Sequence, residues 1–235
     1  MKDIIIQIYG IRTPEDARTV IENGGHHLGV SYGKIKRTPG QLTIEQARKV
    51  FDSVKSGEAV KIGLTIAEDI DEITENMQEL LPDVLHLSGE IEGITPDEIK
   101  ELKRRFPTLK IMQAIPVYPG KPKEEQKAFR YIKEYEEVSD FYLIDTKIEG
   151  CDEGGIGATG EGHDIMIDKA IIENTNVPCI IAGGLTPENV AEAVRITQPF
   201  GADSYSWTNY DSPEPGKPCK DPAKVKAFCE AVRNA

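Results

Sequence analysis

The sequence predicts a (β/α)8 barrel in which residues 1–235 form a single domain. Eight short β-rich runs alternate with longer amphipathic runs from one end of the chain to the other. Dividing the 235 residues among eight units gives about 29 residues for each strand and helix, which is typical of such a barrel. An open doubly wound sheet is the alternative, because the strand patterns that begin at Val84 and Ala202 are weak.

The expected strands are short runs rich in β-branched and apolar residues, at 4–9, 27–32, 60–64, 84–87, 110–115, 141–145, 179–182 and 202–206. The expected helices have apolar residues at helical spacing, at 14–22, 44–54, 70–80, 96–105, 124–137, 165–174, 187–195 and 222–232. Several helices open with Thr-Pro or Asp-Pro, which places a capping residue directly before a proline in the first turn.

The chain is acidic, with a formal net charge of -12 and a pI near 4.9. The negative electrostatic potential of such a protein repels nucleic acid and anionic membranes, so we expect neither as a partner. The N-terminal residues lack the pattern of a signal peptide, and no run is long enough to span a membrane, which predicts a cytoplasmic protein. The four cysteines have no metal-ligand spacing, so we expect reduced thiols and no structural metal.

The segment after the seventh expected strand is a candidate phosphate site. Gly183 and Gly184 follow the apolar run directly, and Thr186 with Pro187 has the pattern of a helix start. Glycine lets a ligand approach the backbone, and the N–H groups at a helix start attract anions. A tight turn without a ligand is the alternative interpretation of the glycine pair. Ser206, after the eighth strand, is a candidate to complete the anion cradle, since phosphate between strands seven and eight recurs in these barrels.

Functional side chains in such a barrel stand at the C-terminal ends of the strands. Asp145 ends the sixth strand, where burial raises a carboxyl pKa toward the range of a general acid. Its alternative role is to accept backbone N–H bonds as a loop cap. His86 and Ser88 lie on one face of the fourth strand, and a histidine there is more often a core residue than a catalyst. Arg37 is a candidate carboxylate or phosphate ligand because its guanidinium binds bidentately.

These features resemble the phosphoribosylanthranilate isomerase family over nearly the whole chain. The resemblance rests on the segments Tyr9-Gly10-Ile11, Leu143-Ile144-Asp145-Thr146, Gly154-Gly155-Ile156-Gly157 and Ala182-Gly183-Gly184-Leu185-Thr186-Pro187-Glu188-Asn189-Val190, with Lys36-Arg37 and Lys220-Asp221-Pro222. It implies a cofactor-independent Amadori rearrangement of an aminoaldose phosphate in tryptophan biosynthesis. It also implies a phosphosugar substrate and a monomer or homodimer.

Residue roles follow from the same resemblance. Asp145 matches the family's acid, and Tyr9 occupies the position of its cysteine base. Arg37 matches the arginine that faces the anthranilate carboxylate, and Ser88 and Asp203 are further substrate-binding candidates. The phosphate-binding candidates are Gly155, Gly183, Gly184 and Ser206.

The chain departs from the family in three motifs. The family's Gln-Leu-His-Gly is His86-Leu87-Ser88-Gly89 here, and a glycine near the phosphate is replaced by Trp207. A phenol is a poorer base at neutral pH than the thiol that Tyr9 replaces. Two alternatives therefore stay open: a paralogue with a different phosphosugar substrate, and a non-catalytic protein that binds a phosphorylated ligand.

Overall fold

A computed structural model of the chain describes residues 4–38, 40–150, 156–157, 162–212 and 217–235. The strands are β1 (Ile5–Tyr9), β2 (His27–Ser31), β3 (Val60–Thr65), β4 (Val84–Leu87), β5 (Lys110–Val117), β6 (Phe141–Thr146), β7 (Cys179–Ile181) and β8 (Gly201–Ser204). The helices are α1 (Pro14–Glu22), α2 (Ile44–Asp52), α3 (Ile70–Glu79), α4 (Pro96–Arg105), α5 (Ala128–Glu134), α6 (Ile165–Ile172), α7 (Val190–Thr197) and α8 (Pro222–Arg233).

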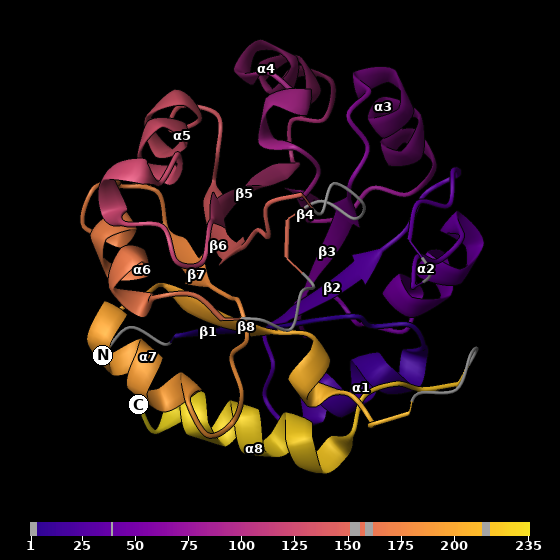
Figure 1. Cartoon of the computed structure of the whole chain (residues 1–235). Helices are drawn as coiled ribbons and strands as arrows, with labels where there is room; N and C mark the ends of the chain where they lie inside the picture. The colour runs from indigo at the N-terminus through magenta and orange to yellow at the C-terminus, as the bar shows by residue number, and fades with distance from the viewer. Residues whose placement is uncertain (1–3, 39, 151–155, 158–161, 213–216) are drawn as a thin grey trace.

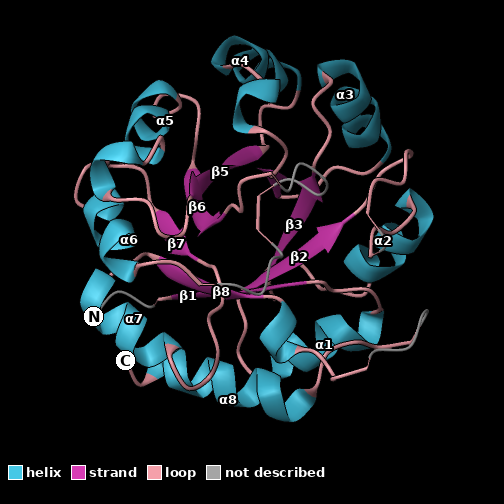
Figure 2. Ribbon diagram, in the orientation of Figure 1, coloured by secondary structure: helices cyan, strands magenta, loops and turns pink. Residues whose placement is uncertain are grey.

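The strands form one closed parallel barrel, so the predicted (β/α)8 architecture is confirmed. Each strand pairs with the next in the chain, and β8 closes the sheet against β1, where Gln7 lies opposite both His27 and Asp203. The helices form a ring outside the strands (Figures 1 and 2). All strand C-termini therefore point to one end of the barrel, which gathers residues that are far apart in the sequence.

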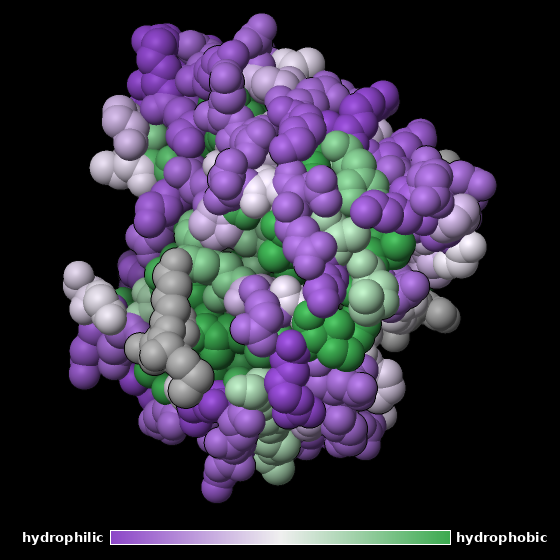
Figure 3. All heavy atoms as spheres, turned by 90° about the vertical axis from the view of Figure 1, so that its left-hand side faces the viewer, coloured by the Kyte–Doolittle hydropathy of each residue, from purple (hydrophilic) through white to green (hydrophobic). Residues whose placement is uncertain are grey.

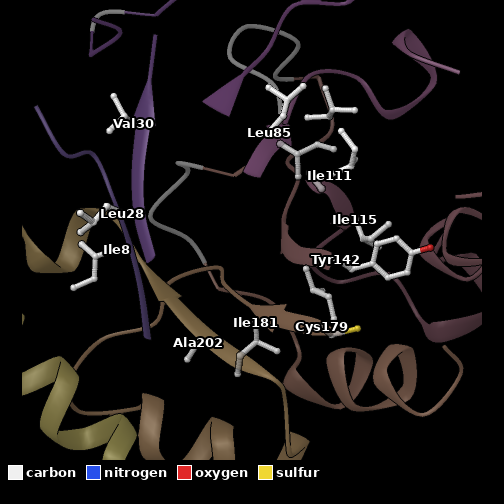
Figure 4. Close-up of a cluster of buried hydrophobic side chains, with 14 of the residues drawn as sticks. Ile8, Leu28, Val30, Leu85, Ile111, Ile115, Tyr142, Cys179, Ile181 and Ala202 are labelled. Atoms are coloured by element: carbon white, nitrogen blue, oxygen red, sulfur yellow. The ribbon is translucent and has the colours of Figure 1, made fainter. Parts of the chain in front are cut away.

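Two layers of apolar side chains form the core. The larger layer lies between strands and helices and includes Ile8, Leu28, Ile181 and Ala202 (Figure 4). The smaller layer fills the barrel interior and consists of Tyr9, Ile62, Val84, Met112, Leu143, Ile180 and Ala182. Because strand side chains alternate between the two layers, β1, β4, β5, β6 and β7 contribute to both.

Capping residues fix where many helices begin. Thr13, Thr43 and Thr95 each form a capping box, in which the threonine hydroxyl accepts from a backbone N–H and the side chain three residues on accepts in return. Asp221 caps α8 ahead of Pro222. The Thr-Pro and Asp-Pro patterns thus predicted the starts of α1, α4 and α8 correctly.

The helix expected at 124–137 is shorter than predicted. A 3₁₀ turn (Lys123–Glu125) precedes α5, which begins only at Ala128. Between them the buried Gln126 side chain accepts from Tyr118 N and donates to the carbonyls of Tyr118 and Lys121. These bonds hold the preceding loop and interrupt the helical pattern.

Two boundaries near the expected phosphate site also differ. Helix α7 begins at Val190, after a turn over 187–189 in which Thr186 N donates to Asn189 Oδ1 at 2.8 Å and Glu188 N donates to Thr186 Oγ1 at 3.2 Å. Strand β8 ends at Ser204, and Ser206 begins a 3₁₀ turn (Ser206–Thr208) instead of extending the strand. The Lys220 ammonium accounts for this turn, because it donates to Tyr205 O and to Thr208 Oγ1, both at 3.1 Å.

Figure 3 shows the side of the molecule that carries α5, α6 and α7, where hydrophilic residues cover much of the surface and apolar residues show between them. Within the described residues, no helix is both long and apolar enough to cross a bilayer.

Asp16 joins the two ends of the chain. This fully buried residue accepts from Arg12 N, Thr13 N and Thr13 Oγ1 with one carboxylate oxygen, each at 3.0 Å. Its other oxygen accepts from the backbone N–H groups of Cys219 and Lys220, both at 2.8 Å. One carboxylate thus ties the start of α1 to the segment that leads into α8.

We expect Asp16→Ala to lower the free energy of unfolding by about 3 kcal/mol, because it leaves several buried N–H groups without an acceptor. Chemical denaturation measures this loss. Glu15→Ala is the matched control, since the neighbouring Glu15 is exposed and its removal should cost less than about 0.5 kcal/mol. Equal losses in the two variants would contradict the assigned role of Asp16.

Candidate active site

Four strands place polar side chains in the barrel interior or at its mouth. Tyr9 ends β1, His86 lies on β4, Asp145 lies on β6 and Asp203 lies on β8. The charges of Asp145 and Asp203 both raise the pKa of Tyr9, so the three side chains share one electrostatic environment. The fold thus brings together four residues that the sequence analysis singled out.

Asp145 is held at the mouth by its own strand and by the following loop. The backbone N–H of Thr146 donates to Asp145 Oδ1 at 2.7 Å. Gly157, with φ of +90°, lies so close that a Cβ there would stand 2.0 Å from Asp145 Oδ2. Burial raises the pKa of Asp145 to about 6. The Thr146 hydrogen bond and the charge of His163 offset only part of this effect. A carboxyl group with this pKa can donate a proton near neutrality.

Ser88 anchors the short segment 156–157 beside Asp145. Its hydroxyl donates to the carbonyl of Ile156 at 2.9 Å, and its own carbonyl accepts from Ile156 N at 2.8 Å. The side chain is buried, so the hydroxyl expected to bind substrate is engaged by the protein. Gly157 N donates to Thr146 O at 3.0 Å, which completes the attachment of this short segment.

Tyr9 and His86 form a bond across the barrel interior, with 2.6 Å between the phenol oxygen and Nδ1. Position 29 must be glycine because a Cβ there would stand 2.0 Å from the Tyr9 ring. Burial raises the pKa of the Tyr9 phenol well above its usual value and lowers the pKa of His86 to about 3. Both groups are therefore neutral at neutral pH, and the phenol keeps its proton.

Asp203 lies beside this pair and is buried. Among the described residues, its Oδ1 has no hydrogen-bond partner. Burial and the charge of Asp145 raise its pKa, while a hydrogen bond with Gln7 opposes the shift. The charge of Asp145 thus disfavours ionisation of Asp203, and such a pair favours a state in which one carboxyl group is protonated and the other ionised.

The glycine pair after β7 adopts the backbone geometry that only glycine takes easily. Gly183 and Gly184 have φ of +80° and +68°. Ser206 is exposed at the start of its 3₁₀ turn. Gly155, the remaining phosphate candidate, lies outside the described residues.

Arg37 is engaged by a carboxylate on α3. Its Nε lies 3.3 Å from Glu72 Oε1, and its Nη2 forms an ion pair with Glu72 Oε2. The Arg37 side chain is 35% exposed, so a ligand can still reach it. A carboxylate ligand at Arg37 would have to exchange with Glu72.

A cavity of about 220 Å³ lies at the mouth beside β5 and β6. Pro116, Tyr118, Ile156 and Lys147 contribute to its wall. The Lys147 side chain is 6% exposed and forms an ion pair with Glu90. Asp145 does not line this cavity, although its strand neighbour Pro116 does.

His163 belongs to this site but was missed by the sequence analysis. Its Nδ1 lies 2.9 Å from Thr146 Oγ1 and its Nε2 lies 2.5 Å from Asp168 Oδ1. The only sequence signal is a histidine shortly before a helix that carries an aspartate five residues on. That spacing does not by itself predict a contact with strand β6.

The described residues hold no group of three or more His, Cys, Asp or Glu side chains arranged to bind a metal ion. Cys179, Cys219 and Cys229 are free and buried, and the remaining cysteine, Cys151, lies outside the described residues.

Residues 6–231 match the family model for N-(5'phosphoribosyl)anthranilate (PRA) isomerase. The N-(5'-phosphoribosyl)anthranilate isomerase of Methanocella arvoryzae is 31% identical over 228 residues, which are 97% of each chain. The enzyme of that name from Methanopyrus kandleri is 32% identical over 232 residues, covering 97% of this chain and 98% of the relative. These matches confirm the resemblance predicted from the sequence motifs.

Solved structures of that name share the fold. The Thermococcus kodakaraensis structure superposes with a TM-score of 0.78 at 22% identity, covering 99% of this chain and all of the other. A further phosphoribosyl anthranilate isomerase structure has a TM-score of 0.75 at 21% identity, with 99% and 100% coverage. It was solved in complex with reduced 1-(o-carboxyphenylamino)-1-deoxyribulose 5-phosphate. At these identities the superpositions show the fold alone.

The buried neutral His86 makes a prediction for the pH dependence of stability. In the unfolded chain a histidine takes up a proton near pH 6.5, but in the folded barrel it does so only near pH 3. The unfolded state therefore binds more protons between these values, and stability falls as the pH falls. At pH 5 this one residue should cost about 2 kcal/mol relative to pH 8.

Urea denaturation at pH 8 and pH 5 measures this cost as the difference between the wild-type protein and His86→Gln. The variant should lose about 2 kcal/mol less on acidification, because glutamine does not titrate. An equal loss in both proteins would show that His86 is not held neutral by burial.

Proposed function

This chain belongs to the N-(5'-phosphoribosyl)anthranilate isomerase family, and on that premise we propose that its barrel mouth isomerises phosphoribosylanthranilate, an aminoaldose phosphate of tryptophan biosynthesis, to the aminoketose phosphate. The observation that carries the proposal is the carboxyl group of Asp145, which is fixed at the end of β6 with a pKa near 6. Family membership disfavours a protein that only binds a phosphorylated ligand. The complexed family structure supports a substrate of this class, because its ligand is a reduced aminoketose phosphate.

Asp145 is the proposed general acid. Its proton passes to the ring oxygen as the bond between that oxygen and C1 breaks, and the nitrogen lone pair forms the C1–N double bond of the imine. Protein contacts on both carboxylate oxygens hold the group in place. A pKa close to the working pH makes such a donor effective.

A different group must then remove the proton from C2. Tyr9 stands at the family's base position, but its phenol is buried, bonded to His86 and held protonated. These contacts support a structural role for Tyr9. We assign the base role to Asp203 in the state in which the proton of the pair lies on Asp145, because Asp203 is then ionised. Asp203 lies on the strand next to β1 and has an unengaged Oδ1 among the described residues. The C2–H electrons then form the C1–C2 double bond as the imine nitrogen becomes an amine.

Two sites are proposed to hold the ends of the substrate. The backbone at Gly183 and Gly184, together with Ser206, receives the phosphate, since glycines leave N–H groups accessible to an anion. Arg37 receives the anthranilate carboxylate in place of Glu72, because a guanidinium binds either carboxylate in the same bidentate geometry.

Replacing Asp145 by Asn should lower kcat for phosphoribosylanthranilate by at least about 100-fold, because the amide cannot donate the required proton. Tyr9→Phe should keep kcat within about threefold and lose about 1 kcal/mol of stability through the missing bond to His86. The disappearance of substrate fluorescence follows the reaction. A Tyr9→Phe enzyme as inactive as Asp145→Asn would restore Tyr9 as the base.

Asp203→Asn should likewise reduce kcat by about 100-fold or more. Introducing Tyr9→Cys into this inactive variant should return part of the activity, because a thiol then occupies the family's base position. Tyr9→Ser is the matched control, as it opens the same space without supplying a comparable base. Recovery with serine and cysteine alike, or full activity in Asp203→Asn, would overturn the assignment of Asp203.

A further inference from the structure

Behind the proposed acid lies a chain of three buried polar side chains. Asp168, on α6, bonds to His163 Nε2, and His163 Nδ1 bonds to the hydroxyl of Thr146 on β6. The side chains of His163 and Asp168 are 1% and 2% exposed, so water contributes little to their solvation. Thr146 directly follows Asp145 and donates its backbone N–H to the Asp145 carboxylate.

These hydrogen-bonded side chains also lie against the end of the neighbouring strand, β7. A Cβ at Gly183 would stand 2.5 Å from Thr146 Oγ1 and 2.9 Å from His163 Nδ1. The pair therefore lies directly against the backbone of the proposed phosphate site. One histidine thus contacts both the strand end that carries the acid and the turn that carries the glycine pair.

Acidic groups surround His163. Burial alone would lower its pKa, but the Asp168 bond together with the charges of Asp168, Asp145 and Asp164 outweighs burial and raises it. Protonated imidazole can donate from both nitrogens, which suits acceptors on Asp168 and Thr146. The arrangement therefore favours an imidazolium ion in the folded protein.

We propose that the Asp168–His163–Thr146 chain is a positioning device for the proposed acid, which orients Asp145 through Thr146 and places a positive charge beside its carboxyl group. This inference rests on the proposed function only where it concerns catalysis. His163 touches none of the reacting atoms, so it is a positioning residue and not a catalytic one.

The positive charge of His163 affects the pKa of Asp145. Burial and the charge of Asp168 raise the pKa of Asp145, whereas the imidazolium lowers it. Asp203 on β8 and Tyr9 on β1 are further titratable groups coupled to it. The histidine therefore keeps the acid from becoming too weak to release its proton near neutral pH. Removing the imidazolium charge should raise the pKa of Asp145.

The first test is an NMR titration of ¹³C-labelled aspartate carboxyl groups, with the Asp145 signal assigned by its loss in Asp145→Asn. In His163→Gln the Asp145 midpoint should move up by about one pH unit, because glutamine can still bond to Thr146 but carries no charge. Glu173→Gln, an exposed change at the end of α6, is the matched control and should leave the midpoint in place. Identical midpoints in wild type and His163→Gln would overturn the proposal.

The wild-type protein provides a second measurement that needs no variant at position 163. The Asp145 signal should show a second inflection at the pH where the His163 imidazole signals titrate, since the two groups are coupled. A single inflection would count against the proposal even if His163→Gln failed to fold.

Kinetics then separate this inference from the proposed function. The alkaline limb of kcat/KM should move to higher pH in His163→Gln, because Asp145 stays protonated longer. An active wild type whose alkaline limb is unmoved in His163→Gln would refute the positioning role and leave the isomerase function intact. A wild type that never converts phosphoribosylanthranilate would refute the function, while the NMR titrations would still decide the role of His163.

Discussion

The limited space inside an eight-stranded barrel is the constraint on which the site depends. Such an interior is just wide enough to be filled by side chains. The Tyr9 ring takes a large share of that space, which requires glycine at position 29 and brings the phenol against His86. Because the pair is sealed from water, both groups stay neutral near neutral pH. The buried carboxyl groups of Asp145 and Asp203 are therefore the proposed partners in proton transfer.

Burial has different consequences at the two levels of the barrel. In the interior, the desolvation of Tyr9 and His86 removes them from acid-base chemistry near neutral pH. Nearer the mouth, the same effect moves the pKa of Asp145 into the range where a proton can be both held and released. Neighbouring groups decide the final pKa of Asp145, because the Thr146 N–H and the charge of His163 both lower it.

An acidic protein that acts on an anionic substrate must attract it locally. Arg37 is already paired with Glu72, and Lys147 with Glu90, so neither adds an uncompensated charge. Lys220 is buried and donates to three oxygens around the turn after β8, and its burial lowers its pKa to about 8. Backbone donors at the glycine turn are thus better placed to receive a phosphate than the lysine is.

The sequence by itself determined the features that depend on neighbours along the chain. Periodicity located the eight strands and helices, threonine and aspartate before proline located helix starts, and Asp145 was recognisable as a carboxyl group at a strand end. These signals are local because strand alternation and helix capping involve residues only a few positions apart.

Only the tertiary structure decided which side chains meet. Tyr9 and His86 are 77 residues apart, and no local pattern indicates that the phenol oxygen bonds to His86 Nδ1 across the barrel. The contact between His163 and Thr146 and the engagement of Ser88 by Ile156 are likewise long-range. A pKa or a free hydrogen-bonding group is a property of the surroundings, and closure of the sheet is what creates those surroundings.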